Sequence, residues 1–503
     1  MSNKEAFFKQ IEEGYKTKGE FLNLGAGMLG EETITNAFVK LPLKTINRHG
    51  LIAGATGTGK TKTLQVFAEN LSEAGVPVLL MDVKGDLSGL AQASPGHKKI
   101  DERHEKIGFG FEAKAFPIEI LTISEQDGTR MRATVSEFGP TLLSRILDLS
   151  DTQSGIVSVL FKYCDDNKLP LLDLKDFKKI LQYSTNEGRD EIEAEYGRIS
   201  TSSTGSILRK IVEIEQQGGD LFFGERSFEV RDLQRVDNNG KGIISVLRLT
   251  DIQGKPKLFS TFMLQLLAEI YETFPEQGDS GRPELVIFID EAHLIFKEAS
   301  KALLEQIESI VKLIRSKGVG IYFCTQNPKD IPSDVLSQLG MKIQHALRAF
   351  TANDRKAIKL AAQNYPDSEF YDTATVLTQL GIGEALVSCL NEKGIPTPLV
   401  RTMLRAPMSR MDVLSKKEIK DVINSSYIYD KYNEEIDRES AYEILNKKIV
   451  KVNAQEKADE RKKRAKKQKT TRSRKSTKMN PILKVLTSAT FIRGVFQILR
   501  RIK

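Results

Sequence analysis

The sequence predicts an α/β fold in which helices cover both faces of a mostly parallel β-sheet. Three observations predict it. A glycine-rich segment, Gly54–Thr61, joins a short apolar run to a helical pattern. A second apolar run, Leu285–Ile289, ends in two acidic residues. Around these segments, apolar runs of strand length alternate with helical patterns, as in sheets built from strand–helix–strand units.

The elements of this core follow in chain order. Residues 1–45 are expected to be helical and then loop-like, with little β structure. A strand at 50–53 leads into a helix over 60–74, which Gly75 ends. Continuous apolar runs are typical of strands buried on both faces. Such a run predicts a strand at 76–81, and further strands are expected at 116–122, 242–249, 285–289, 320–325, 342–347 and 383–390, with helices at 257–273 and 301–316.

The remaining segments have a different character. Residues 136–235 show repeated helical periodicity without strand patterns, so we expect a mostly helical insertion that divides the core into 46–135 and 236–408. Residues 409–455 are expected to form a charged helical extension. Residues 456–480 are rich in lysine and arginine without apolar periodicity, which favours a disordered linker. Residues 481–503 are expected to form a basic amphipathic helix.

Charge is divided unevenly along the 503 residues. The segment 447–503 holds 20 Lys/Arg and 3 Asp/Glu, a net charge of +17. Because the whole chain carries +8, the other residues together carry −9. The tail is therefore where nucleic acid or an anionic membrane surface would be attracted. No apolar run is long enough to span a membrane. The three cysteines form no CxxC pair, and Met1–Tyr15 lacks a signal-peptide pattern, so we expect a cytoplasmic protein without a zinc site or disulfide.

The glycine-rich segment matches the phosphate-binding pattern GxxxxGK[ST]. A loop of this kind turns its backbone N–H groups and a helix N-terminus toward phosphates, while the lysine contacts the β- and γ-phosphates and the hydroxyl contacts Mg²⁺. The sequence therefore predicts ATP–Mg²⁺ binding, with Thr61 on the metal. The expected nucleotide-binding residues are Gly54, Ala55, Thr56, Gly57, Thr58, Gly59, Lys60, Thr61 and Lys62.

Two acids are expected at the carboxyl end of the strand 285–289. Ligands bind outside these ends in open α/β sheets. Asp290 is the expected Mg²⁺ ligand, and Glu291 the expected general base that polarises the attacking water. His293 completes the letters DEAH, yet the other helicase motifs are not evident, and a packing role for this histidine is as good an interpretation. Asp82, Lys84 and Asp86, after the strand 76–81, are expected to shape the edge of the site.

Further polar residues are candidates for contacts to the γ-phosphate. Gln326 follows the strand 320–325 and is the expected sensor of the phosphate or attacking water, with loop capping as the alternative. Arg315 is the leading candidate for an arginine finger, supplied by a neighbouring subunit. Arg348 and Arg355 are rivals, and each of these arginines could instead be a surface ion-pair partner.

Several segments resemble the bacterial HerA-like ATPases, and more closely the branch named for similarity to the HerA helicase C-terminal region. The resemblance covers about residues 25–410 and is carried by NRHGLIAGATGTGKT, VPVLLMDVKGDLSGL, EQQGGDLFFGE, FIDEAHLIF, LIRSKGVGIYFCTQNPKDIP and LGMKIQHALRAF. HerA has an N-terminal β-barrel, whereas only about 45 residues precede the phosphate loop here, so partner contacts made by that barrel cannot be transferred.

This resemblance implies a RecA-like core, a homo-oligomeric ring that is usually hexameric, and ATP-driven movement of DNA. It places Lys60, Thr61, Asp290, Glu291 and Gln326 at the family's Walker and sensor positions. It also places Arg315 at the proposed trans-acting arginine.

Two functions are therefore weighed. The first is an ATP hydrolase of the HerA/FtsK type, a ring-forming DNA translocase or helicase-like motor. The second is an ATP-dependent switch or scaffold that acts on a protein partner without moving DNA. The acidic body and the lack of an evident aromatic–basic platform for single strands favour the second, whereas the resemblance and the basic tail favour the first. The tail helix could instead lie on an anionic membrane or pack on protein.

Overall fold

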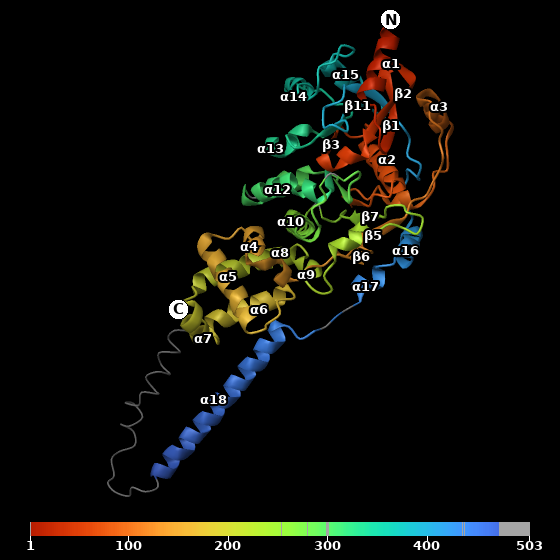
Figure 1. Cartoon of the computed structure of the whole chain (residues 1–503). Helices are drawn as coiled ribbons and strands as arrows, with labels where there is room; N and C mark the ends of the chain where they lie inside the picture. The colour runs from red at the N-terminus through yellow and green to blue at the C-terminus, as the bar shows by residue number, and fades with distance from the viewer. Residues whose placement is uncertain are drawn as a thin grey trace. The chain divides into compact units, whose positions relative to one another are not determined.

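A computed structural model describes residues 2–471 except 253, 279, 298–300, 435 and 437. The chain divides into two compact units, residues 1–442 and 443–503. The first unit is built on one 12-stranded sheet (Figure 1). Its strands are β1 (Phe21–Leu29), β2 (Glu32–Pro42), β3 (Gly50–Ala53), β4 (Val78–Asp82), β5 (Ile118–Thr122), β6 (Thr129–Arg130), β7 (Ile244–Arg248), β8 (Leu285–Ile289), β9 (Val319–Thr325), β10 (Met341–Gln344), β11 (Glu384–Ser388) and β12 (Val400–Leu404).

Strand order explains how distant motifs come together. The sheet runs β2-β1-β12-β11-β10-β3-β9-β8-β4-β7-β5-β6. The strands from β10 to β6 pair in parallel. The four strands at the other edge pair in an antiparallel manner and join the sheet through β10 and β11. The expected parallel α/β core is therefore confirmed, and each of the eight strands expected from the sequence is present. Because β3, β9, β8 and β4 are neighbours, their carboxyl ends lie side by side.

Both faces of the central strands are buried, which is why they read as continuous apolar runs. On one face, Phe67 of α2 (Lys60–Glu73) packs against Phe288 of β8 and Tyr322 of β9. On the other, Phe296 of α11 (His293–Lys297) packs against Phe323 of β9. The other core helices are α3 (Lys98–Ile107), α10 (Pro256–Thr273), α12 (Lys301–Ile314), α13 (Ser333–Leu336), α14 (Ala352–Ala362) and α15 (Thr373–Gln379).

Between β6 and β7 the chain forms a group of helices, as the periodicity of 136–235 predicted. They are α4 (Val135–Ile146), α5 (Asp151–Asp166), α6 (Leu174–Thr185), α7 (Arg189–Tyr196), α8 (Thr201–Gln216) and α9 (Gly219–Phe222). Capping boxes begun by Thr134, Ser150 and Asp173 fix three of the starts. The insertion contacts the core where α4 packs on α10 and α12. The domain boundaries themselves stay a prediction.

The expectation of little β structure in residues 1–45 is wrong. After α1 (Asn3–Gly14), β1 and β2 form a hairpin that extends the sheet through β12. The strand β1 is buried on both sides along most of its length and therefore shows no alternation. It also contains Gly25 and Gly27, which lower β propensity. At Gly25, a Cβ atom would lie 2.0 Å from the Met403 carbonyl oxygen, so glycine is needed for this close strand pairing.

The C-terminal region continues as helices, α16 (Lys416–Asn424), α17 (Tyr429–Asn433) and α18 (Ala441–Thr471). The expectation of disorder from residue 456 is wrong as far as Thr471. Lys, Arg, Ala, Glu and Gln all have high helix propensity, so a chain rich in them can be helical without an apolar face. The expected helix 481–503 lies outside the described residues. Within the described part, no helix combines the length and apolarity that crossing a bilayer needs.

Candidate active site

The phosphate-loop residues lie at the strand–helix junction that the pattern requires. The loop joins β3 to α2, with Gly59 in the left-handed region (φ +110°) at the helix start. Its first part is fixed to neighbouring strand ends: Gly54 N–H donates to the Thr325 carbonyl (3.2 Å) and Ala55 N–H to the Ala346 carbonyl (2.8 Å). Gly57 (φ +78°) has no neighbour within 4 Å of where a Cβ would be. The middle of the loop is therefore open at the carboxyl edge of the sheet.

Lys60 points back into this loop. Its Nζ donates to the carbonyl oxygens of Gly54 (2.6 Å) and Ala55 (3.1 Å), and only 6% of the residue is exposed. Burial, together with the charge of Lys84, lowers the pKa of the ammonium, whereas Glu291 and Asp290 oppose the shift. Two lysines and two carboxylates thus share one small region. Thr61 follows in the first turn of α2 and is partly buried.

Asp290 and Glu291 follow β8 directly, at the same edge as the loop. Each is 5% exposed, and Glu291 has φ +48°, a conformation uncommon for residues with a side chain. Burial raises the pKa of Asp290 to about 6, and the nearby Glu291 adds to this while Lys84 opposes it. Burial also raises the pKa of Glu291, but the ion pair with Lys84 outweighs burial, so its pKa lies below the usual value.

Lys84 reaches these acids from the loop after β4. Its Nζ lies 2.5 Å from Glu291 Oε1 and 3.9 Å from Asp290 Oδ2. Asp82 fixes this loop because its carboxylate accepts hydrogen bonds from the N–H groups of Gly85 (2.6 Å), Asp86 (3.2 Å) and Leu87 (3.1 Å). Asp82 therefore holds the turn, and Lys84 is the residue of this loop that enters the site.

The sensor loop lies between the phosphate loop and the acids. Gln326 is exposed at the end of β9, beside His293 in a surface depression that Asn327 and Lys329 also line. Asn327 and Asp330 form a capping box, and Thr325 donates to Asp330 Oδ2 (2.6 Å), so the loop is held without using Gln326. His293 Nδ1 lies 3.2 Å from Glu291 Oε2. The structure thus brings His293, which the sequence left undecided, into contact with the expected general base.

The arginine candidates lie at different places. Arg315 is exposed at the start of a short 3₁₀ turn, Arg315–Lys317, just before β9. Because β9 has seven residues, Arg315 is separated by roughly 20 Å from the carboxyl edge that holds the phosphate loop. Arg348 and Arg355 are also exposed, after β10 and on α14. Arg315 therefore cannot reach the phosphates of its own subunit.

Comparison with known proteins agrees with this geometry. A family described as Helicase HerA-like C-terminal matches residues 28–493. The chain belongs to this family. Two relatives are the DNA double-strand break repair helicases HerA of Sulfolobus acidocaldarius (22% identity over 71% of this chain and 66% of that protein) and Saccharolobus solfataricus (23% identity over 76% and 69%). The chain thus spans about two thirds of the length of these relatives.

A solved structure supports the fold of this HerA-like chain. The plasmid coupling protein TrwB in complex with ADP and Mg²⁺ superposes with a TM-score of 0.51 and 14% sequence identity, covering 81% of this chain and 94% of that one. At this identity the likeness shows the fold, a RecA-like P-loop ATPase core, and not the activity.

The HerA-like site has groups suited to a magnesium ion. Asp290 Oδ2 is buried and accepts no hydrogen bond from the described residues. No cluster of three or more Asp, Glu, His or Cys suited to hold a metal occurs among the described residues. Beside a nucleotide, Mg²⁺ needs only one or two protein oxygens, because phosphates and water supply its other ligands. The hydroxyl of Thr61 and the carboxylate of Asp290 are the groups that would hold it.

Two features of this HerA-like site were not found from the sequence. His345, fully buried after β10, shares a 2.9 Å hydrogen bond between its Nε2 and Thr63 Oγ1 and packs under Gly54. Burial and the charge of Lys60 lower its pKa to about 4, so it is neutral. A lone histidine carries no sequence signal for this role. Lys62, an expected nucleotide-binding residue, donates from its Nζ to the Met411 carbonyl (2.5 Å) and to Gln65 Oε1 (3.2 Å), so any contact of Lys62 with nucleotide stays a prediction.

Proposed function

We propose that this chain is an ATP hydrolase of the HerA/FtsK type that works as a ring-forming DNA translocase or helicase-like motor. The observation that carries the proposal is the convergence of Lys60, Lys84, Asp290 and Glu291 at the carboxyl ends of adjacent parallel strands. The family membership and the HerA helicases among its relatives support DNA as the polymer that is moved.

The residues divide the chemistry between them. The open loop around Gly57 offers backbone N–H groups to the phosphates, and Lys60 stabilises negative charge on the β- and γ-phosphates. Glu291, kept ionised by Lys84, takes a proton from water as that water forms a bond to the γ-phosphorus and the bond to ADP breaks, giving ADP and phosphate. Gln326 orients the water. Mg²⁺, when bound, neutralises charge on the phosphates.

A ring is proposed because the leading arginine candidate, Arg315, is too far from the γ-phosphate of its own subunit to contact it. Arg315 lies at the opposite edge of the sheet, exposed, where it can face the site of a neighbouring copy. A head-to-tail interface of this kind closes into a ring when its rotation permits. The repeated arrangement would bring one Arg315 to each ATP site.

The experiment is steady-state ATP turnover with and without single-stranded and double-stranded DNA. We expect clear stimulation by one type of DNA, with Lys60→Ala and Glu291→Gln inactive under all conditions. A chain ending at Tyr442, where the first unit ends, should keep basal turnover. Loss of stimulation in that chain would assign the DNA contact to the basic tail. Turnover indifferent to every DNA would contradict the motor and favour the switch or scaffold.

A further inference from the structure

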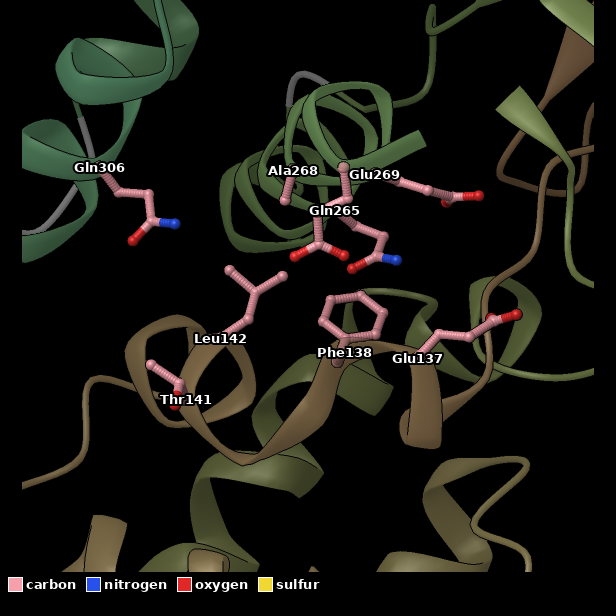
Figure 2. Close-up of a pocket in the computed structure, with 9 residues that line it drawn as sticks. Glu137, Phe138, Thr141, Leu142, Gln265, Ala268, Glu269 and Gln306 are labelled. Carbon is pink, nitrogen blue, oxygen red and sulfur yellow. The ribbon is translucent and has the colours of Figure 1, made fainter. Parts of the chain in front are cut away.

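A pocket separate from the ATP site lies where the helical insertion meets the core (Figure 2). It has a volume of about 350 Å³, at the small end of the range for ligand sites. Its walls come from α4 of the insertion and from α10 and α12 of the core. The lining residues are Glu137, Phe138, Thr141, Leu142, Gln265, Ala268, Glu269, Glu272 and Gln306.

The polar lining is rich in hydrogen-bond acceptors. Gln265 is only 6% exposed, and its Oε1 is buried without a hydrogen-bond partner among the described residues. The Oε1 of Gln306 is in the same state. Figure 2 shows both amides reaching into the space that Leu142 and Phe138 line from the other side. Leaving such a buried acceptor unpaired is unfavourable, so this arrangement favours a ligand that donates hydrogen bonds.

Three carboxylates line the pocket, and no described residue of the lining carries a balancing positive charge. Glu269 and Glu272 come from α10 and Glu137 from α4, and the described residues of the lining include no lysine or arginine. One oxygen of Glu137 is used to cap α4, through Thr134 N–H (2.7 Å) and the Ser227 hydroxyl (2.6 Å). Burial raises the pKa of Glu269 to about 7, and the charges of Glu137 and Glu272 contribute.

We propose that this pocket binds an organic cation that carries an ammonium or guanidinium group. These groups only donate hydrogen bonds, which matches a lining of carboxylates and unpaired amide oxygens. The apolar part of the pocket, Phe138, Leu142 and Ala268, suits the methylene stem that carries such a group, and the Phe138 ring can face its charge.

The bound cation would join the insertion to the ATPase core. Its charge would pair with acids on α4 and α10 at once, and α10 leads along the chain to β8, which carries Asp290 and Glu291. Cation binding in this pocket does not depend on the DNA motor, because it can be measured in the absence of nucleotide and DNA. Two sources offer the same chemistry: a free aliphatic amine, and a lysine or arginine side chain presented by another protein.

The test is calorimetric titration of the full chain with putrescine, and separately with N-acetyl-lysine amide and N-acetyl-arginine amide, at fixed ionic strength. We expect saturable binding of at least one probe. Binding of putrescine alone would identify a free amine as the source, and binding of the blocked amino acids would identify a protein side chain. Absence of saturable binding for all three would overturn the proposal.

Variants locate the binding in this pocket. Glu272→Gln and Gln265→Met, which change the lining with little change in volume, should each weaken binding by about tenfold. Glu20→Gln removes the same charge from an exposed residue outside the pocket and should leave affinity unchanged. Equal weakening by Glu20→Gln would show a general charge effect and overturn the pocket assignment. Far-ultraviolet circular dichroism of each variant checks that the fold is retained.

Discussion

At the scale of single residues, Lys84 controls the ionisation of the expected general base. Glu291 is almost fully buried, and burial alone would favour its protonated form. The ammonium of Lys84 at 2.5 Å reverses this preference. The same ion pair also fixes the direction of the Glu291 side chain, since the turn that carries Lys84 is held by three N–H groups on Asp82. We therefore expect Lys84 to position the general base for catalysis.

Replacing Lys84 should change the pH dependence of ATP turnover. In Lys84→Ala, burial is no longer offset, so the pKa of Glu291 rises and the acidic limb of the pH–rate profile moves to higher pH. Turnover near neutral pH should fall by about tenfold or more, with partial recovery at pH 8.5. Lys98→Ala, which changes an exposed helix residue, should leave the profile unchanged. A uniform loss across the pH range would show that Lys84 does not set this ionisation.

Glu269 in the pocket between α4 and α10 should make stability depend on pH. Its pKa is about 7 in the folded chain against 4.5 for the free side chain, so the folded state binds its proton more tightly. Its contribution to the free energy of unfolding is present at low pH and is lost as pH rises from about 4.5 to 7.

Glu269→Gln keeps the shape of the side chain and one acceptor oxygen but cannot ionise. The variant should therefore not lose stability as the pH rises. The variant should unfold about 2–5 °C above the natural chain at pH 8 and at nearly the same temperature at pH 4.5, as measured by calorimetric scans. Glu20→Gln is the matched control. An equal gain at both pH values would contradict the role of ionisation.

The roles of site residues in short sequence motifs were predictable from the sequence, whereas contacts between residues far apart in the chain were not. The phosphate loop and the acids after β8 follow from short segments whose chemistry depends on neighbours in sequence. The contact of Lys84 with Glu291 joins loops about 200 positions apart, and the hydrogen bond between Thr63 and His345 joins residues 282 positions apart. Such pairs depend on strand order, which no single segment encodes.

At the scale of elements, the sheet is predictable where strands are buried and regular. The expected strands in the middle of the sheet, such as β4, β8 and β9, are dominated by apolar residues, whereas β1 contains glycines and the two-residue β6 is too short to give a pattern. The antiparallel extension by β11, β12, β1 and β2 shields the β10 edge of the parallel core, which would otherwise be an open edge.

Gly25 is a position where the antiparallel extension should be highly sensitive to substitution. A Cβ there would lie 2.0 Å from the Met403 carbonyl oxygen, and φ of +153° is unfavourable for other residues. Gly25→Ala should therefore destabilise the chain by about 3 kcal/mol or more. Gly30→Ala, at φ +60° with nothing within 4 Å, should cost only about 1 kcal/mol. Denaturant midpoints measure both, and equal costs would contradict the tight pairing of β1 with β12.

At the scale of the whole molecule, the position of Arg315 indicates how copies of the chain would assemble. The ATP site lies at the carboxyl ends of the strands and Arg315 at the amino end of β9, so one copy cannot bring the two together. If a neighbour supplies the arginine, Arg315→Ala should still bind ATP and assemble. Its turnover should fall by about 10³-fold, the lower range for an arginine finger.

Mixing two inactive variants decides between a trans-acting finger and a local role. Arg315→Ala keeps its own Glu291, and Glu291→Gln keeps its own Arg315. In randomly mixed assemblies about a quarter of the interfaces would combine an intact Glu291 with an intact Arg315 from the neighbour, so ATP turnover should reappear on mixing. Arg355→Ala mixed with Glu291→Gln is the control for the rival candidate. If the Arg315→Ala mixture stays inactive while size-exclusion chromatography shows mixed assemblies, Arg315 does not act across the interface. The ring would then need another residue to complete its ATP sites.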